Sequence, residues 1–256
     1  MSRLALVKKG QFTVATGNPA YPPWFGGSPA KGSPWKISDP TSGQGFESAV
    51  VYAVAKQLGF PKGSVHWIAV PFDNTYKPGA KNFDVAVEQI SYKPARAQNV
   101  DFSDSYYKLN QALVAVKGTP ITHVKTLAEL KGHKLGVQLG TTSYDTVIAI
   151  KPNQKPAVYS SSNDVNSGLK AHQIEGIVVD LPTAFYITGS GQVPNSVIVG
   201  QFPTKKNPEH LGMVLSKGSP LTSCLNKAIA AVKAKGALAQ LTRQWLSTKV
   251  SVPVLK

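Results

Sequence analysis

Runs of apolar residues alternate along this chain with segments in which apolar residues recur every three or four positions. The runs predict β-strands, which lie at residues 12–16, 65–70, 83–87, 112–116, 134–138, 176–180 and 211–215. The helical periodicity predicts α-helices at residues 46–59, 127–132, 143–150, 163–172, 182–188 and 221–246, the last broken near 235–236. Strands that alternate with helices predict an α/β fold with mainly parallel pairing.

The chain order indicates two successive α/β halves. Residues 26–45 are rich in Gly, Pro and Ser and have no periodicity, which predicts an exposed loop or hairpin. No short-period repeat is present, so solenoids and propellers are excluded. The strand after Tyr107 and the stretch 197–202 are the expected crossings between the halves.

Length and charge restrict the class of protein. The 256 residues, 42% of them hydrophobic, suffice for one large domain or two lobes. No segment approaches the ~20 apolar residues that a membrane span needs. A formal charge of +15 raises the alternative of nucleic-acid binding. The lysines are scattered, however, and no zinc finger, RNA-recognition motif or basic heptad segment is visible, so we expect a solvated basic surface.

Cysteine and histidine give little support to catalysis. The single Cys224 excludes an intramolecular disulfide and a cysteine-based metal site, and its helical surroundings favour a small buried residue over a nucleophile. The five histidines form no His-x-x-x-His or Glu-x-x-His pair. There is no Gly-x-Ser-x-Gly elbow and no phosphate loop. We therefore expect neither a cofactor nor a metal.

The segment 91–107 carries the most specific chemistry. It follows the predicted strand 83–87 and contains Arg96, whose guanidinium could bind a carboxylate with help from Ser91 and nearby backbone N–H groups. Its pattern, Ser-x-x-Pro-x-Arg-Ala-x-x-Val-Asp-Phe-Ser-x-x-Tyr-Tyr, resembles the signature of the polar amino-acid solute-binding proteins of ABC importers.

Four further pieces resemble the same family in the same order. They are residues 17–24 (Gly-Asn-Pro-Ala-Tyr-Pro-Pro-Trp), 45–47 (Gly-Phe-Glu), 131–143 (ending Gly-Thr-Thr-Ser) and 171–180 (ending Val-Val-Asp). The resemblance spans most of the chain, from about residue 12 to 245.

The resemblance implies a two-lobed α/β fold of the type II periplasmic-binding-protein class. Each lobe would be a mixed sheet flanked by helices, with a hinge of two crossing strands. The first lobe would comprise residues 1–110 and 203–256, and the second residues 111–202.

The resemblance also implies roles for polar residues in both lobes. Arg96 and Ser91 would bind the α-carboxylate of a free amino acid. Thr142, with Thr141, would offer a helix N-terminus to the same carboxylate, and Asp180 would bind the α-amino group. The alternatives are an exposed helix-capping arginine, a turn-forming serine, and N-cap roles for Thr142 and Asp180.

Side-chain recognition depends on aromatic and acidic positions. Tyr21 and Phe72 resemble aromatic walls around the ligand, and Trp24 is a further candidate; ordinary core packing is the alternative. An acidic pair beside such walls would suit a cationic or other polar amino acid, although solvated surface positions are the alternative. The candidates at these polar positions are Glu47, Glu88, Gln89 and Asn18. Asn18 departs from the usual Asp, and Tyr92-Lys93 departs from the usual Ile-Thr.

These features together predict a binding protein that delivers an amino acid to an ABC-transporter permease. The first nine residues are too short for a secretory signal, so we expect a cytoplasmic chain or, by the resemblance, a periplasmic or extracellular mature form that acts as a monomer. One alternative is a prephenate or arogenate dehydratase on the same fold, with Glu88 as the assisting acid. A sensor module or adhesin is another.

Overall fold

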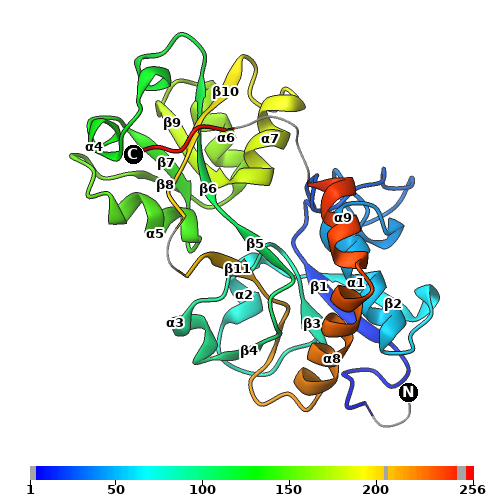
Figure 1. The fold of residues 1–256 in the computed structure, drawn as a ribbon. Coiled ribbons are helices and arrows are strands. Elements are labelled where there is room, and N and C mark those ends of the chain that lie inside the picture. The colour runs from blue at the N-terminus through cyan, green and yellow to red at the C-terminus, as the bar shows by residue number, and fades with distance from the viewer. Residues whose placement is uncertain (1–3, 205–206, 247–251) are drawn as a thin grey trace. The chain divides into compact units, whose positions relative to one another are not determined.

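The computed structural model describes residues 4–204, 207–246 and 252–256 (Figure 1). The chain divides into two compact units. The first lies within Met1–Lys108 and His210–Ser247, and the second within Leu109–Glu209 and Thr248–Lys256. Each unit is an α/β structure with its own mixed sheet, as the sequence predicted.

The first unit contains a five-stranded sheet in the order β2-β1-β3-β12-β4. Strand β1 (Phe12–Thr16) runs parallel to β2 (Val65–Ala69) and to β3 (Val85–Ala86). Strand β12 (Val214–Ser216) returns antiparallel to β3 and to β4 (Val100–Phe102). All five residues of β1 are buried, as expected for a central strand that is covered on both faces.

Helix α1 (Phe46–Gln57) packs against the C-terminal helices α8 (Leu221–Ala234) and α9 (Ala237–Trp245) of the same unit (Figure 1). The break between α8 and α9 falls at Gly236, which has φ 71°, as the sequence predicted. Cys224 on α8 is partly exposed rather than buried. The shorter helices of this unit are α2 (Phe72–Tyr76), α3 (Pro94–Ala97), η1 (Pro40–Ser42) and η2 (Lys62–Ser64).

The second unit contains a five-stranded sheet in the order β10-β6-β9-β7-β8. Strand β6 (Gln111–Val116) is antiparallel to its two neighbours, β10 (Ser196–Gln201) and β9 (Gly176–Asp180). Strand β7 (Leu135–Gln138) runs parallel to β9 and to β8 (Ala157–Tyr159).

The two faces of this second sheet hold separate hydrophobic clusters, and successive residues of β6 alternate between them. Leu113 and Ala115 pack with side chains from α5 on one face, whereas Ala112 and Val114 pack with α6 and α7 on the other. This is the period-two alternation of a strand buried on both sides. The helices that supply these faces are α4 (Leu127–Leu130), α5 (Thr142–Ala149), α6 (Ser162–Lys170) and α7 (Leu181–Gly189), with η3 (Pro120–His123).

The chain passes between the units within two short strands, β5 (Tyr107–Leu109) and β11 (Glu209–Leu211), which pair in a two-stranded sheet. The predicted crossing after Tyr107 agrees with β5. The predicted crossing at 197–202 is wrong, because those residues form most of β10 inside the second sheet. The single strand predicted at 211–215 is divided between β11 and β12.

The C-terminal segment differs from the predicted lobe boundaries. We expected all of residues 203–256 in the first lobe, but residues 252–256 belong to the second unit. Val254 forms a parallel bridge with Gln201, and Leu255, which is 2% exposed, packs into the cluster that contains Phe202. Burial of this leucine fixes the segment, and its sequence does not show which sheet it will join.

The glycine-rich segment 26–45 is less exposed than predicted. Trp35, Ser38 and Pro40 in this segment are buried. Trp35 is a large apolar side chain that the loop folds inward, and removal of that surface from water stabilises a stretch without regular structure. None of the helices in the described ranges combines the length and the apolar character that a bilayer crossing requires.

Candidate functional site

Arg96 is held in a fixed orientation inside the first unit. Helix α3 begins at Pro94, which suits the first helical position, and brings Arg96 back toward Ser91. The Arg96 Nη1 donates a hydrogen bond to the Ser91 carbonyl oxygen at 2.7 Å. Its guanidinium lies over the Tyr76 ring, 4.4 Å from the centroid, and over the Phe72 ring at 5.3 Å. Arg96 is 5% exposed, so the alternative of an exposed capping arginine is wrong.

The aromatic support for Arg96 comes from helix α2. Phe72 and Tyr76 stand one helical turn apart and pack edge to face, with ring centroids 5.4 Å apart. The Tyr76 hydroxyl donates to Asp73 Oδ1 at 2.6 Å. Burial, together with this hydrogen bond, raises the pKa of Tyr76 to about 12, so the phenol is neutral at physiological pH. The sequence pattern identifies Phe72 but not Tyr76, although the spacing of four residues between them is a usable signal.

Glu47 is a buried carboxyl group in the first turn of α1. It accepts hydrogen bonds from the Gln89 backbone N–H at 2.8 Å, from Gln89 Nε2 at 2.6 Å and from the Tyr106 hydroxyl. Burial raises the pKa of Glu47 to about 7, although the three hydrogen bonds lower it. The solvated-surface alternative is wrong for Glu47, which is 1% exposed.

The raised pKa of Glu47 predicts a pH-dependent stability. Because the folded state holds this proton more tightly than the unfolded state, the stabilisation is complete below pH about 4.5 and is lost as pH rises through about 7. The shift corresponds to about 3 kcal/mol. In urea unfolding of the ligand-free protein, the free energy of unfolding should fall between pH 5 and pH 8 by an amount of this order. We expect this fall to be absent from the Glu47→Gln variant. Equal pH dependence in both proteins would contradict the assignment.

Glu88 lies beside Glu47, directly before Gln89. The residue is partly exposed, but its Oε2 is buried and has no hydrogen-bond partner within the described part of the chain. Burial, followed by the nearby Glu47 and Asp73 carboxylates, raises its pKa well above the usual value. The Glu88 carboxyl group also lies close to Gly17, where an added Cβ would stand 2.0 Å from Oε1.

The remaining predicted residues of the first unit have different surroundings. Asn18 is exposed and its amide bridges the following loop, donating to the Pro34 carbonyl at 2.8 Å and accepting from the Lys36 N–H at 3.0 Å. Tyr21 is partly exposed. Trp24 is 1% exposed and packs edge-on against two aromatic rings, so core packing describes it.

In the second unit, helix α5 starts at Thr142. Thr141 is its N-cap, and the Thr141 hydroxyl accepts a hydrogen bond from the Tyr144 N–H at 3.2 Å. The N-cap alternative considered for Thr142 is therefore wrong, because Thr142 is the first helical residue. Ser143 is buried and donates to Gln111 Oε1 at 2.7 Å.

Gln111 connects two carboxylates of the second unit, a feature that sequence analysis missed. Its Nε2 donates to Asp180 Oδ1 at 2.7 Å and to Glu209 Oε2 at 2.9 Å. Asp180 occupies the N-cap position of α7, but its side chain makes no capping hydrogen bond to that helix. The N-cap alternative is therefore correct as to position, but Asp180 does not cap the helix through its side chain. The β6–β9 register, in which Gln111 faces Asp180, creates this contact and is not visible in the sequence.

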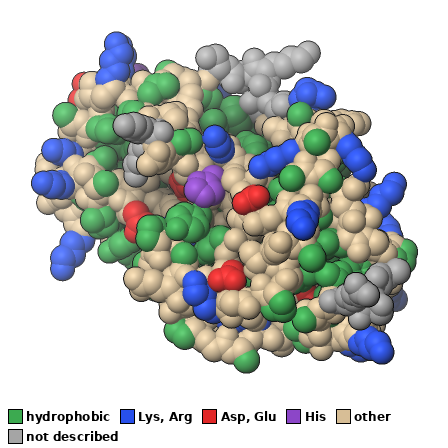
Figure 2. Space-filling model, turned by 60° about the horizontal axis from the view of Figure 1, so that its bottom comes forward, with side chains coloured by type: hydrophobic (Ala, Val, Ile, Leu, Met, Phe, Trp, Pro, Cys, Tyr) green, Lys and Arg blue, Asp and Glu red, His purple; other side chains and the backbone are tan. Residues whose placement is uncertain are grey.

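The structure thus groups the predicted residues of the first unit around α2, α3 and the strand end after β3. Arg96, Ser91 and Phe72 are in direct contact, and Glu47 bonds to Gln89. Positive charge is distributed more widely. Figure 2 shows Lys and Arg side chains in separate places on the face in view rather than in one patch, as the scattered sequence pattern predicts.

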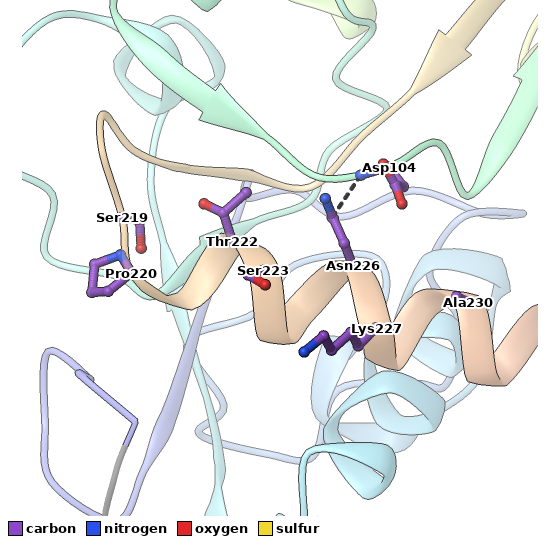
Figure 3. A pocket seen from close by; sticks show the side chains of 8 residues that line it. All are labelled: Asp104, Ser219, Pro220, Thr222, Ser223, Asn226, Lys227 and Ala230. Carbon is purple, nitrogen blue, oxygen red and sulfur yellow. Dashed lines mark hydrogen bonds between the residues drawn. The ribbon is translucent and has the colours of Figure 1, made fainter.

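A separate hollow of the first unit lies at the start of α8 (Figure 3). Asn226 projects from the helix there and its Oδ1 accepts a hydrogen bond from the Asp104 N–H at 2.8 Å. None of the predicted site residues lines this hollow, and its lining contains no aromatic side chain. It is therefore not our candidate site.

A family model matches residues 27–248 of the chain, and its description is bacterial extracellular solute-binding proteins, family 3. The chain belongs to this family. The match covers most of both units and agrees with the family that the Arg96 segment resembles. The two mixed α/β sheets flanked by helices have the type II periplasmic-binding-protein architecture.

Curated relatives of this solute-binding protein, and solved structures similar to it, are amino-acid-binding proteins. ABC transporter arginine-binding protein 1 of Escherichia coli is 28% identical over 208 residues, which is 78% of this chain and 81% of the relative. The arginine-binding extracellular protein ArtP of Bacillus subtilis is 25% identical over 86% of this chain and 85% of the relative. A structure described as an ancestral arginine-binding protein bound to arginine has a TM-score of 0.76 at 27% identity, covering 93% of this chain and 99% of that one.

The family and these relatives are binding proteins, so the chain is a substrate-binding protein rather than an enzyme. The dehydratase alternative gains no support from them.

Proposed function

We propose that this solute-binding protein binds a free L-α-amino acid outside the cytoplasm and delivers it to the permease of an ABC importer. The observation that carries the proposal is the buried guanidinium of Arg96, oriented by two aromatic rings and by the Ser91 carbonyl. A guanidinium held in this way presents paired N–H donors to a carboxylate without losing side-chain entropy on binding.

Other residues complete the proposed site. Ser91 adds a polar group beside Arg96, and Phe72 with Tyr21 forms apolar walls for the ligand side chain. In the second unit, Thr142 at the start of α5 and Asp180 at the end of β9 are the proposed polar ligand-binding residues. The hydrogen bond from Gln111 supports this role for Asp180, because it orients the Asp180 carboxylate. That carboxylate makes no capping hydrogen bond to α7.

The relatives support the amino-acid class and the transporter. Both curated relatives are named as arginine-binding proteins, and one is named as an ABC transporter component. The periplasmic or extracellular location that we propose follows from the same family, whose members are described as extracellular.

A thermal-shift screen tests the proposal. At a concentration 100 times Kd, one or a few of the twenty L-amino acids should raise Tm by about 5–10 °C, because a ligand that binds only the folded state stabilises it by mass action. The carboxamide of the same amino acid lacks the negative charge and should produce no comparable rise. The absence of any shift, confirmed by calorimetry at high concentration, would contradict the proposal.

A further inference from the structure

The Glu88 carboxyl group has a position that the carboxylate-binding role of Arg96 does not explain. Oε2 is buried and has no hydrogen-bond partner among the residues described by the structure, which is unfavourable for a polar atom. Gly17, which follows β1, leaves the space that the carboxyl group occupies, because an added Cβ would meet Oε1 at 2.0 Å.

The surroundings of Glu88 are acidic on two sides. Glu47 on α1 and Asp73 on α2 both disfavour its negative charge, whereas Gly17 contributes no charge. Asp73 accepts a hydrogen bond from the Tyr76 hydroxyl, and the Tyr76 ring lies against Arg96. Helix α2 therefore contacts Arg96 and also contributes an acid near Glu88.

This geometry restricts the ligand group that Glu88 can receive. A second carboxylate or an apolar side chain would leave the buried oxygen without a donor. A neutral amide could donate a hydrogen bond but would not offset the two neighbouring acids. An ammonium or guanidinium would supply both the donor and the positive charge.

Building on the proposed function, we propose that Glu88 receives the cationic side-chain group of a basic amino acid and releases a proton when it does so. In the ligand-free protein, burial and the two neighbouring acids favour the protonated form of the Glu88 carboxyl group. As the cation enters, the O–H bond breaks, its electron pair stays on the carboxylate, and the proton passes to the buffer. Hydrogen bonds from the N–H groups of the ligand to the Glu88 carboxylate then replace the O–H bond.

Burial and the neighbouring acids support this exchange, because they raise the pKa of Glu88 in the ligand-free protein. A bound cation has the opposite effect and lowers it. The same cation also offsets the Glu47 and Asp73 charges. Arginine or lysine should therefore bind more tightly as pH rises from about 5 to 8, whereas a neutral analogue should not.

Isothermal titration calorimetry with L-arginine, L-lysine and L-citrulline tests the inference. Citrulline has the shape of arginine with an uncharged ureido group. We expect arginine or lysine to bind at least about 100-fold more tightly than citrulline. Titrations at pH 7 in phosphate and in Tris, whose ionisation enthalpies differ, should show proton release with the cationic ligand and none with citrulline.

Glu88→Gln is the main variant, because glutamine has the shape of the protonated acid but cannot ionise. It should lower affinity for the cationic ligand about 100-fold, reduce proton release and change citrulline affinity less than about threefold. Glu175→Gln, the same change at an acid that pairs with His133 in the second unit, is the control and should have no effect on binding.

Gly17→Ala is an independent variant that keeps the acid. Its Cβ should push the flexible end of Glu88 out of position and reduce the preference for arginine or lysine over citrulline. If a neutral amino acid such as citrulline or glutamine binds as tightly as the cationic ones, or if binding releases no proton, the inference is wrong while the proposed function stands. If no α-amino acid binds at all, the proposed function itself fails.

Discussion

Replacement of Arg96 by alanine should lower the affinity for the amino-acid ligand by at least about 100-fold. The guanidinium is 5% exposed, and its place over Phe72 and Tyr76 leaves it ordered before the ligand arrives. Loss of one partner from a desolvated, hydrogen-bonded charge pair costs about 2–5 kcal/mol, much of it from the ligand carboxylate left buried without a donor. Isothermal titration calorimetry of the purified variant with the best ligand of the thermal-shift screen measures the effect.

Two matched variants make this result specific. Arg96→Lys keeps the positive charge but not the planar fork, so we expect it to weaken binding by at least about tenfold. Arg243→Ala removes an exposed arginine from α9 and should leave affinity unchanged. A folded Arg96→Ala protein that binds as tightly as the parent would show that the carboxylate lies elsewhere.

Replacement of Gly45 by alanine should lower the free energy of unfolding by about 3–5 kcal/mol. Gly45 has φ 86° and ψ 157°, a conformation that is essentially restricted to glycine. An added Cβ would also stand 2.4–2.6 Å from the Phe25 backbone. Steric overlap with backbone atoms adds to the conformational strain, because hydrogen bonds from the Gly26 N–H to the Gln44 carbonyl and from the Phe46 N–H to the Pro23 carbonyl join the two segments.

The close contact between the backbones of Gly45 and Phe25 allows the start of α1 to form hydrogen bonds with the preceding loop. Helix α1 has no side-chain N-cap, and its first N–H groups donate instead to backbone carbonyls, Phe46 to Pro23 at 2.9 Å and Glu47 to Trp24 at 2.8 Å. The variant should therefore also displace Glu47 and weaken ligand binding.

Gly43→Ala is the matched control for this effect. Gly43 also has a positive φ, 81°, but the nearest atom to an added Cβ is a Tyr52 side-chain carbon at 3.5 Å. The cost there should be about 1–2 kcal/mol, the penalty of the left-handed conformation alone. Urea unfolding of the two variants separates the cost of the contact with Phe25 from the cost of the positive φ. Similar losses in both would show that contact with Phe25 contributes nothing.

The regular elements follow from local sequence because their causes are local. The pattern of residues 46–59 predicted α1, and Gly236 predicted the break between α8 and α9. Arg96 could be predicted because part of its support is local: the Ser91 carbonyl accepts its hydrogen bond and Pro94 starts its helix.

Residues whose partners are distant in the chain were harder to predict. The Glu47 carboxyl group bonds to Tyr106, 59 positions away, and Gln111 bonds to Glu209, 98 positions away. These contacts depend on strand order and register, which period-two patterns leave undetermined. The unit to which residues 252–256 belong was predicted wrongly for a similar reason. An apolar residue such as Leu255 can pack on the core of either unit, and the local sequence does not show which.

The amino-acid sequence alone determined the α/β class, the division into two halves, the family and the arginine that carries the proposed function. Only the tertiary structure decided which acids are buried together, that Glu88 Oε2 has no partner within the described ranges, and which units the crossing strands connect. The physical reason is that periodicity and capping act over a few residues, whereas desolvation and charge repulsion depend on groups brought together from separate segments.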